Sequence, residues 1–353
     1  MSITVRPASL AHEEDLIVAV LDRNLPDRPN RKIQRMRHAN PLGPGWSWIL
    51  SERDKDRVAG VASVFPRSFW VNGKKVLCGQ VIEFAVEAPY RSLGPAVLLQ
   101  KATFEPVSSG AVSFGYDCPP HERGMSTFLR LGMGSRAEVV RYALLLRSEE
   151  YLHKRLGSGI WTKPLVATAN LVLRHNRSYP AADHFEVHEH RTAFGEEFSE
   201  LDRVVSSRDM VRAGRAAEDL NWKYLEDPAM GDSSEPSSGR YQVLVVRGSG
   251  ELIAFAVLFA ENGFAWLGDL FGRDLNECGS ALLEAAVDIC HRQKIVRLDA
   301  LCSSVSSLRP LLERVGFRPR ERVYRVVPYE NTSQTPKLLN SDLEWAFTNF
   351  EVS

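Results

Sequence analysis

The order of strand-like and helix-like segments in the first half of the chain recurs in the second half at a nearly constant spacing. Four pairs of landmarks keep almost the same separation along the chain: Ile3 and Phe185, Pro41 and Pro228, Gly94 and Gly279, and Gly132 and Gly316. Strands and helices of any α/β chain can fall at similar spacing, but one separation shared by all these landmarks favours a duplicated domain.

The length of 353 residues also exceeds what one hydrophobic core usually serves. We therefore predict four parts: an N-terminal domain over residues 1–150, a bridging segment over 151–183, a C-terminal domain over 184–330 and a tail over 331–353. In the tail, the polar run ENTSQTPKLLN is expected to be weakly ordered, whereas DLEWAF is expected to dock on the protein.

Composition excludes several classes of protein. Lys and Arg number 44, as do Asp and Glu, so no net charge attracts the chain to a nucleic acid. No uninterrupted apolar run is long enough to span a bilayer, and we expect a cytoplasmic protein with no membrane partner. Five scattered cysteines without a C-x-x-C pair predict reduced thiols rather than disulfides or a zinc site.

Three histidines, His184, His188 and His190, alternate onto one face of a predicted strand. This spacing can bind a metal, but Glu186 interleaves and no other ligand cluster accompanies them. A solvated strand face is the favoured interpretation, and no metal is expected.

The segment RSLGPAVLLQ, residues 91–100, follows the apolar strand VIEFAVEA and begins a helix. The first N–H groups of a helix have no intrahelical partner and, together with the helix dipole, attract anions. Gly94 lets an anion approach the backbone, Pro95 suits a first helical position, and Arg91 can add a bidentate contact to phosphate. The segment therefore predicts a pyrophosphate site.

The order R-x-x-G-x-A after an apolar strand resembles the pyrophosphate-binding motif of the GNAT superfamily of N-acetyltransferases, and FLRLGMG resembles their short terminal helix. The resemblance covers about residues 3–145 and, more weakly, 185–327. It implies two tandem GNAT-like domains, each a mixed, mostly antiparallel sheet flanked by helices, with acetyl-CoA as cofactor. The residues it assigns to the cofactor are Phe84, Ala85 and Val86, by backbone pairing with pantetheine, and Arg91, Ser92, Leu93, Gly94, Pro95 and Ala96 at the phosphates.

The second copy of the motif differs from the first. When Gly94 is matched with Gly279, Arg91 falls on Asn276, and Glu277 stands beside the phosphate position. The glycine and the following alanine persist as helix-packing residues, whereas the cation is lost and like charge repels. We expect one cofactor site, in the N-terminal half.

Attack of an amine on a thioester needs a base and benefits from an acid. Glu83 and Glu87 share one strand face, and Glu83 lies among apolar residues that raise the pKa of a carboxyl, so Glu83 is our candidate base; a structural carboxylate is the alternative. The resemblance places the usual acid, a tyrosine, where this chain has Phe128. The adjacent strand end offers four substitutes: Tyr116, Asp117, Cys118 and His121.

These observations predict an acetyl-CoA-dependent N-acyltransferase that modifies a primary amine of a small acceptor, such as an amino sugar or an amino acid derivative. Phe128 and the degenerate second copy leave a non-catalytic acyl-CoA-binding or scaffold protein as the alternative. Aminoacyl transfer from tRNA by a similarly doubled fold is disfavoured by the neutral charge.

Overall fold

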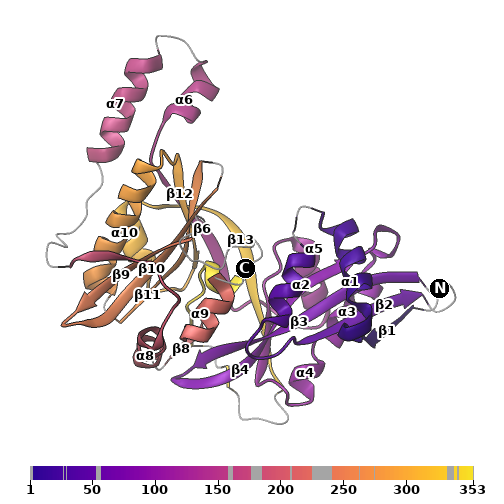
Figure 1. Ribbon diagram of the computed structural model, residues 1–353. Helices are drawn as coiled ribbons and strands as arrows, with labels where there is room; N and C mark the ends of the chain where they lie inside the picture. Colours follow the sequence, from indigo (N-terminus) through magenta and orange to yellow (C-terminus); the bar gives the residue numbers. More distant parts are fainter. Residues whose placement is uncertain are drawn as a thin grey trace. The chain divides into compact units, whose positions relative to one another are not determined.

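The computed structural model describes residues 3–26, 28, 30–52, 57–157, 162–175, 185–206, 209–224, 241–261, 263–273, 275–331, 338–339 and 342–352. The chain forms two compact units (Figure 1). Unit 1 comprises Met1–Glu138, Ser206–Asp232 and Tyr324–Glu344, and unit 2 comprises Val139–Val205, Ser233–Val323 and Trp345–Ser353. The units therefore interleave along the sequence, which differs from the consecutive division at residues 150, 183 and 330.

The sheet of unit 1 has the order β1-β2-β3-β4-β5-β13. Its strands are β1 (Ile3–Pro7), β2 (Trp46–Glu52), β3 (Arg57–Val71), β4 (Lys74–Val86), β5 (Phe114–Asp117) and the end of β13 (Arg318–Tyr329). Only β4 and β5 pair in parallel among the recorded pairs of this unit. At the far end of β3, β8 (Met210–Ala213) pairs antiparallel, and β14 (Glu344–Trp345) pairs with β8.

Helices cover both faces of this sheet because its strands carry apolar residues on both sides. Val61 and Ala85 pack against α1 (Leu10–Asn24), whereas Ala62 and Val64 pack on the opposite face with Leu99 of α3 (Leu93–Ala102). The other helices of the unit are α2 (Asn30–His38), η1 (Ala88–Tyr90), α4 (Glu105–Ser108), α5 (Glu122–Arg130) and α9 (Ala217–Tyr224).

The sheet of unit 2 has the order β6-β12-β11-β10-β9-β7, again with one parallel pair, β11 and β12. Its strands are β6 (Ala137–Leu145), β7 (Val187–His190), β9 (Tyr241–Gly248), β10 (Glu251–Glu261), β11 (Phe264–Gly272) and β12 (Arg297–Ser303). Its helices are α6 (Glu149–Leu156), α7 (Thr162–His175), α8 (Glu196–Val204), α10 (Leu275–Arg292), α11 (Arg309–Val315) and α12 (Asn349–Val352). The long helix α10 lies along the sheet (Figure 1) and supplies Leu282, Leu283 and Ala286 to its core.

The duplicated fold class expected from the sequence is confirmed, since both sheets repeat one order of pairing around a single parallel pair. The last strand of each half, however, is exchanged. Val327–Tyr329 of β13 pair with β5, and β6 pairs with β12 along residues 139–145. The compact units interleave because antiparallel pairing carries each closing strand into the other half's sheet and because β8 of the second half pairs with β3.

The end of the chain docks, as the sequence predicts for DLEWAF. Trp345 and Phe347 are buried, while most of the polar run before them, residues 332–337, lies outside the described residues. None of the helices described in the structure has the length and apolar character needed to cross a membrane.

Candidate functional site

The parallel strands β4 and β5 pair only over a short stretch. The recorded register joins Cys78–Gln80 to Phe114–Tyr116 and ends there, although β4 continues to Val86. Opposite, β3 accompanies β4 through Val86. From Val81 onward, the edge of β4 on the β5 side therefore has no neighbouring strand in the described part of unit 1.

A β-bulge lies directly after this point. Val61 of β3 faces Ala85 of β4, and Ser63 faces Ile82. Between these pairs, β3 has one residue, Ala62, whereas β4 has two, Glu83 and Phe84. Glu83 has a φ of 57°, a left-handed conformation that a non-glycine residue adopts at a cost of about 1–2 kcal/mol. Bulges redirect side chains and bend a strand. This one bends β4 where its pairing with β5 ends, which opens a gap between parallel strands.

The N-terminus of α3 lies just after the end of β4. Ser92 is the N-cap residue in extended conformation, and its side chain makes no capping hydrogen bond. The backbone N–H groups of Leu93 and Gly94 have no recorded partner in the described chain. A Cβ placed on Gly94 would meet nothing within 4 Å. The helix therefore begins with exposed donors and open space, as an anion site requires.

Two predicted residues lie differently from expectation. Pro95 occupies the third helical position, because α3 begins at Leu93, and its missing N–H still costs no intrahelical bond there. The guanidinium of Arg91 is exposed but partly engaged: Nε donates to Val86 O at 2.9 Å and Nη2 to Asn24 Oδ1 at 2.8 Å. Arg91 thus also fastens α1 to the end of β4.

Glu83 is buried against α2. Gln34 Nε2 donates to Glu83 Oε1 at 2.8 Å, while Oε2 has no hydrogen-bond partner by distance among the described residues. Burial raises the pKa of the Glu83 carboxyl. The Arg37 charge, the hydrogen bond from Gln34, the Ser63 hydroxyl and the Arg28 charge offset this only in part. A carboxylate with a raised pKa accepts a proton more readily than an ordinary carboxylate does.

Arg37 is the buried cation beside Glu83. Its side chain donates to Pro44 O, to Ser47 Oγ at 2.6 Å and to Ser63 Oγ at 3.3 Å, and Nη2 has no partner in the described chain. Burial lowers the pKa of Arg37 to about 10, and the Glu83 charge opposes that shift. Arg37 was not predicted from the sequence, because charged side chains on a polar helix such as α2 usually face solvent.

The substitute acids lie in different environments. Tyr116 is fully buried, with its ring 5.3 Å from that of Phe69, whereas His121 is exposed at the N-cap of α5. Asp117 ends β5, and burial raises the pKa of its carboxyl to about 7, against a backbone hydrogen bond from Cys118. Among these substitutes, Asp117 therefore has a carboxyl of raised pKa, His121 is exposed, and Tyr116 belongs to the core.

Tyr324 is a candidate that the sequence analysis did not identify. Arg325 N donates to Pro119 O at 3.4 Å, so β13 continues beside the segment that follows β5 and brings Tyr324 there. Burial and the Cys118 thiol raise the pKa of the Tyr324 phenol, and Arg28, which also acts on Glu83, lowers it. A role for Tyr324 in unit 1 was not predicted from the sequence, because its strand, β13, lies in the second half of the chain.

Phe128, at the position of the usual tyrosine, is packed in a small core with Met125 and Val327. Its ring is 1% exposed, so this position serves packing in the structure.

The residues before α3 and α10 give a second comparison of the two motif copies. Arg91 lies two residues before the start of α3, and Arg273 lies two residues before the start of α10. An arginine thus precedes each of the two helices, and Arg273 contacts Glu251 at 3.5 Å. Glu277 remains in the first turn, which keeps a negative charge at this helix end.

The two glycines also differ, contrary to the expectation that both serve packing. Gly279 is the fifth residue of α10, and a Cβ there would lie 2.5 Å from Leu311 Cδ2. Gly279 thus permits α10 and α11 to pack closely, whereas Gly94 faces open space.

Of the histidines considered for a metal, His184 lies outside the described residues. His188 is 3.7 Å from Glu186, and His190 lies 3.2 Å from Ala193 O. Among the residues that the structure describes, no group of three potential ligands comes together.

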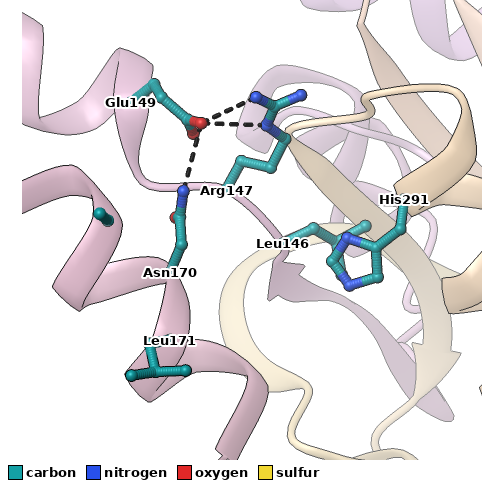
Figure 2. A pocket seen from close by; sticks show the side chains of 7 residues that line it. Leu146, Arg147, Glu149, Asn170, Leu171 and His291 are labelled. Atoms are coloured by element: carbon teal, nitrogen blue, oxygen red, sulfur yellow. Dashed lines mark hydrogen bonds and ion pairs between the residues drawn. The ribbon is translucent and has the colours of Figure 1, made fainter. Parts of the chain in front are cut away.

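A pocket of about 330 Å³ in unit 2 involves the bridging helices. Figure 2 shows Arg147, Glu149 and Asn170 pointing toward one another beside Leu146 and His291. Both Arg147, at 2.8 Å, and Asn170, at 3.2 Å, donate to Glu149 Oε1. Glu149 Oε2 is buried without a hydrogen-bond partner in the described chain. The hydrogen bond between Asn170 and Glu149 joins α6 to α7.

Two repeated units, each with a splayed parallel pair, a bulge at the splay and a helix start after the bulged strand, are the features of the GNAT fold in tandem. Neither a family model nor a curated protein matches the sequence of the chain. Solved structures do match: a GCN5-related N-acetyltransferase from Anabaena variabilis has a TM-score of 0.64 at 12% identity, covering 93% of this chain and 72% of its own. A probable N-acyltransferase of unknown function from Enterococcus faecalis has a TM-score of 0.60 at 10% identity, with the same coverage.

Saccharomyces cerevisiae N-myristoyltransferase with bound myristoyl-CoA is similar as well, with a TM-score of 0.59 at 12% identity over 93% of this chain and 82% of that one. At such low identities these likenesses establish the fold, and the fold agrees with the resemblance found in the sequence.

Proposed function

We propose that unit 1 binds acetyl-CoA and transfers its acetyl group to a primary amine of a small acceptor, an amino sugar or an amino acid derivative. The observation that supports this most strongly is the coincidence, in one unit, of the unpaired β4 edge, the bulge at Glu83 and the open helix start at Gly94. An extended ligand arm can pair with such an edge while its phosphates meet the helix N-terminus.

In this proposal the backbone of Phe84–Val86 pairs with the pantetheine arm, and the N–H groups of Leu93 and Gly94, with Arg91, hold the pyrophosphate. Bound acetyl-CoA supplies the thioester. Glu83 takes a proton from the attacking amine, directly or through water, as the carbon–nitrogen bond forms. The carbon–sulfur bond breaks, and the leaving sulfur receives a proton from Tyr324.

The test of the cofactor is thermal unfolding with acetyl-CoA, longer acyl-CoAs and CoA. A ligand at 100 times its Kd stabilises the folded protein by about 2.7 kcal/mol, which raises Tm by several degrees. A larger rise with a long acyl chain than with acetyl would contradict the acetyl preference. No rise with any of these ligands would contradict the site.

Activity distinguishes transfer from mere binding. A panel of amino sugars and amino acids, assayed by release of free CoA thiol, should contain an acceptor that increases release. The alternative, a non-catalytic acyl-CoA-binding protein, has support in Phe128 and in the complete burial of Glu83. Binding without acceptor-dependent thiol release would favour that alternative.

Tyr324→Phe is expected to reduce kcat by about 10²-fold or more, the usual contribution of a positioned acid, and to leave acetyl-CoA affinity unchanged. The same rate is measured in Tyr116→Phe and His121→Gln for comparison, because the sequence made both Tyr116 and His121 candidates for the acid. The steady-state rate with a saturating acceptor measures the effect. Loss of kcat in His121→Gln but not in Tyr324→Phe would transfer the role to His121.

A further inference from the structure

The second unit repeats the gap between parallel strands. The pairing of β11 with β12 ends at Leu267 and Ala300. At the same point β11 has a bulge against β10: Val257 of β10 faces Asp269 and Leu258 faces Leu267, so Gly268 has no partner residue on β10. Beyond it, β11 continues to Gly272 and β12 to Ser303. The bulge and the splay of unit 1 thus have counterparts in unit 2.

The gap in unit 2 is filled by the C-terminal segment, residues 345–352. Ser303 N of β12 donates to Phe347 O at 2.9 Å, and Cys302 forms an antiparallel bridge with Thr348. On the other side, Asn349 Nδ2 donates to Leu267 O, the last paired residue of β11, at 3.0 Å. The segment therefore contacts both strands of the splay.

The C-terminal segment is built to hold this position. Thr348 and Glu351 form a capping box: Glu351 Oε2 accepts from Thr348 N at 2.8 Å, and Thr348 Oγ1 accepts from Phe350 N at 3.1 Å. Thr348 Oγ1 also lies 3.4 Å from Asp269 Oδ1. Phe347 and Phe350 are at most 1% exposed, so two aromatic side chains anchor the segment.

Little space remains beside the segment. The cavity left between β11 and β12 measures about 10 Å³, and Thr348 forms part of its wall. Such a cavity holds about one water molecule and no pantetheine arm. In unit 1, by contrast, no segment from outside the sheet is recorded bonding to the backbone of Val81–Ala85 among the described residues.

We propose that the splayed cleft of unit 2 is a binding site for the chain's own C-terminal segment, which takes the place that a pantetheine arm takes in unit 1. The site recognises a short peptide in extended conformation followed by one helical turn. Acyl-CoA is excluded from unit 2, and Glu277 in the first turn of α10 adds an unfavourable charge for phosphate. The chain then carries one acyl-CoA site, a conclusion that rests on the proposed function of unit 1.

The first test is the stoichiometry of acetyl-CoA binding by calorimetry. The expected result is one equivalent per wild-type chain, with an affinity that falls by on the order of 10²-fold in Gly94→Val. Two equivalents in the wild type, one of which keeps its affinity in Gly94→Val, would overturn the proposal for unit 2. No binding by the wild type would instead contradict the proposed function of unit 1.

The second test does not depend on acetyl-CoA. In the full chain, Asn349→Ala combined with Thr348→Ala should speed amide hydrogen exchange at Ser303 at least tenfold, since its acceptor on Phe347 moves away. Thr348→Ser alone keeps the capping hydroxyl and should leave this exchange unchanged. Amides of β2 in unit 1 serve as the internal control. Equal exchange at Ser303 in the double variant and the wild type would overturn the proposed contact.

Discussion

Gly94→Val is expected to reduce acetyl-CoA affinity by on the order of 10²-fold while Tm stays within about 2 °C of the wild type. The side chain would occupy the space through which a phosphate reaches the N–H groups of the α3 start, and two charge-assisted hydrogen bonds are worth a few kcal/mol. The fold tolerates the change, because a Cβ there meets nothing within 4 Å and glycine is itself unfavourable in a helix. Calorimetry and thermal unfolding measure the two effects.

Gly279→Val is the matched control in the second half. Its Cβ would lie 2.5 Å from Leu311 Cδ2, and overpacking of this kind costs about 1–3 kcal/mol. Tm should fall, and acetyl-CoA affinity of the folded protein should remain. The opposite pattern, a stability loss in Gly94→Val with retained affinity, would mean that Gly94 has only a structural role.

Glu83→Gln is expected to lower kcat by about 10²–10⁴-fold, the range for loss of a general base, with acetyl-CoA affinity unchanged. Glutamine keeps an oxygen to accept the hydrogen bond from Gln34, so the local contacts are preserved. The steady-state rate at a saturating acceptor concentration measures the change. Wild-type rates in the variant would identify Glu83 as a structural carboxylate.

The pH profile gives an independent signature of Glu83. A base works when deprotonated, so kcat/KM should rise with pH through the raised pKa of Glu83 and level off above it. This rising limb should disappear in Glu83→Gln. Asp117→Asn is the control, because the pKa of Asp117 is about 7 and could produce a similar limb. If the limb vanishes in Asp117→Asn and survives in Glu83→Gln, Asp117 is the titrating group.

Local sequence patterns were sufficient for the elements around Gly94. An apolar strand that ends before Arg91, followed by small residues and an apolar helix, can form few other structures, because the backbone donors of a helix start are the same in every helix. The burial of Glu83 among apolar neighbours was also readable from strand alternation. The bulge was not, since it depends on how β3 and β4 align across the pair.

Other errors have the same origin. Equal spacing along the chain matched Gly94 with Gly279, but Gly94 is the second residue of α3 and Gly279 the fifth of α10, so the two glycines take different places in their helices. Tyr324 and the C-terminal segment could not be placed because each acts on a sheet formed by residues distant in sequence.

The sequence by itself determined the duplicated order of strands and helices and the helix start at residues 91–96, because both follow from local periodicity and backbone chemistry. Only the tertiary structure decided which strand closes each sheet, which groups surround Glu83, and that residues 345–352 fill the second cleft. These features arise from hydrogen bonds and packing between segments far apart in the chain. Local sequence patterns do not show which distant segments will pair.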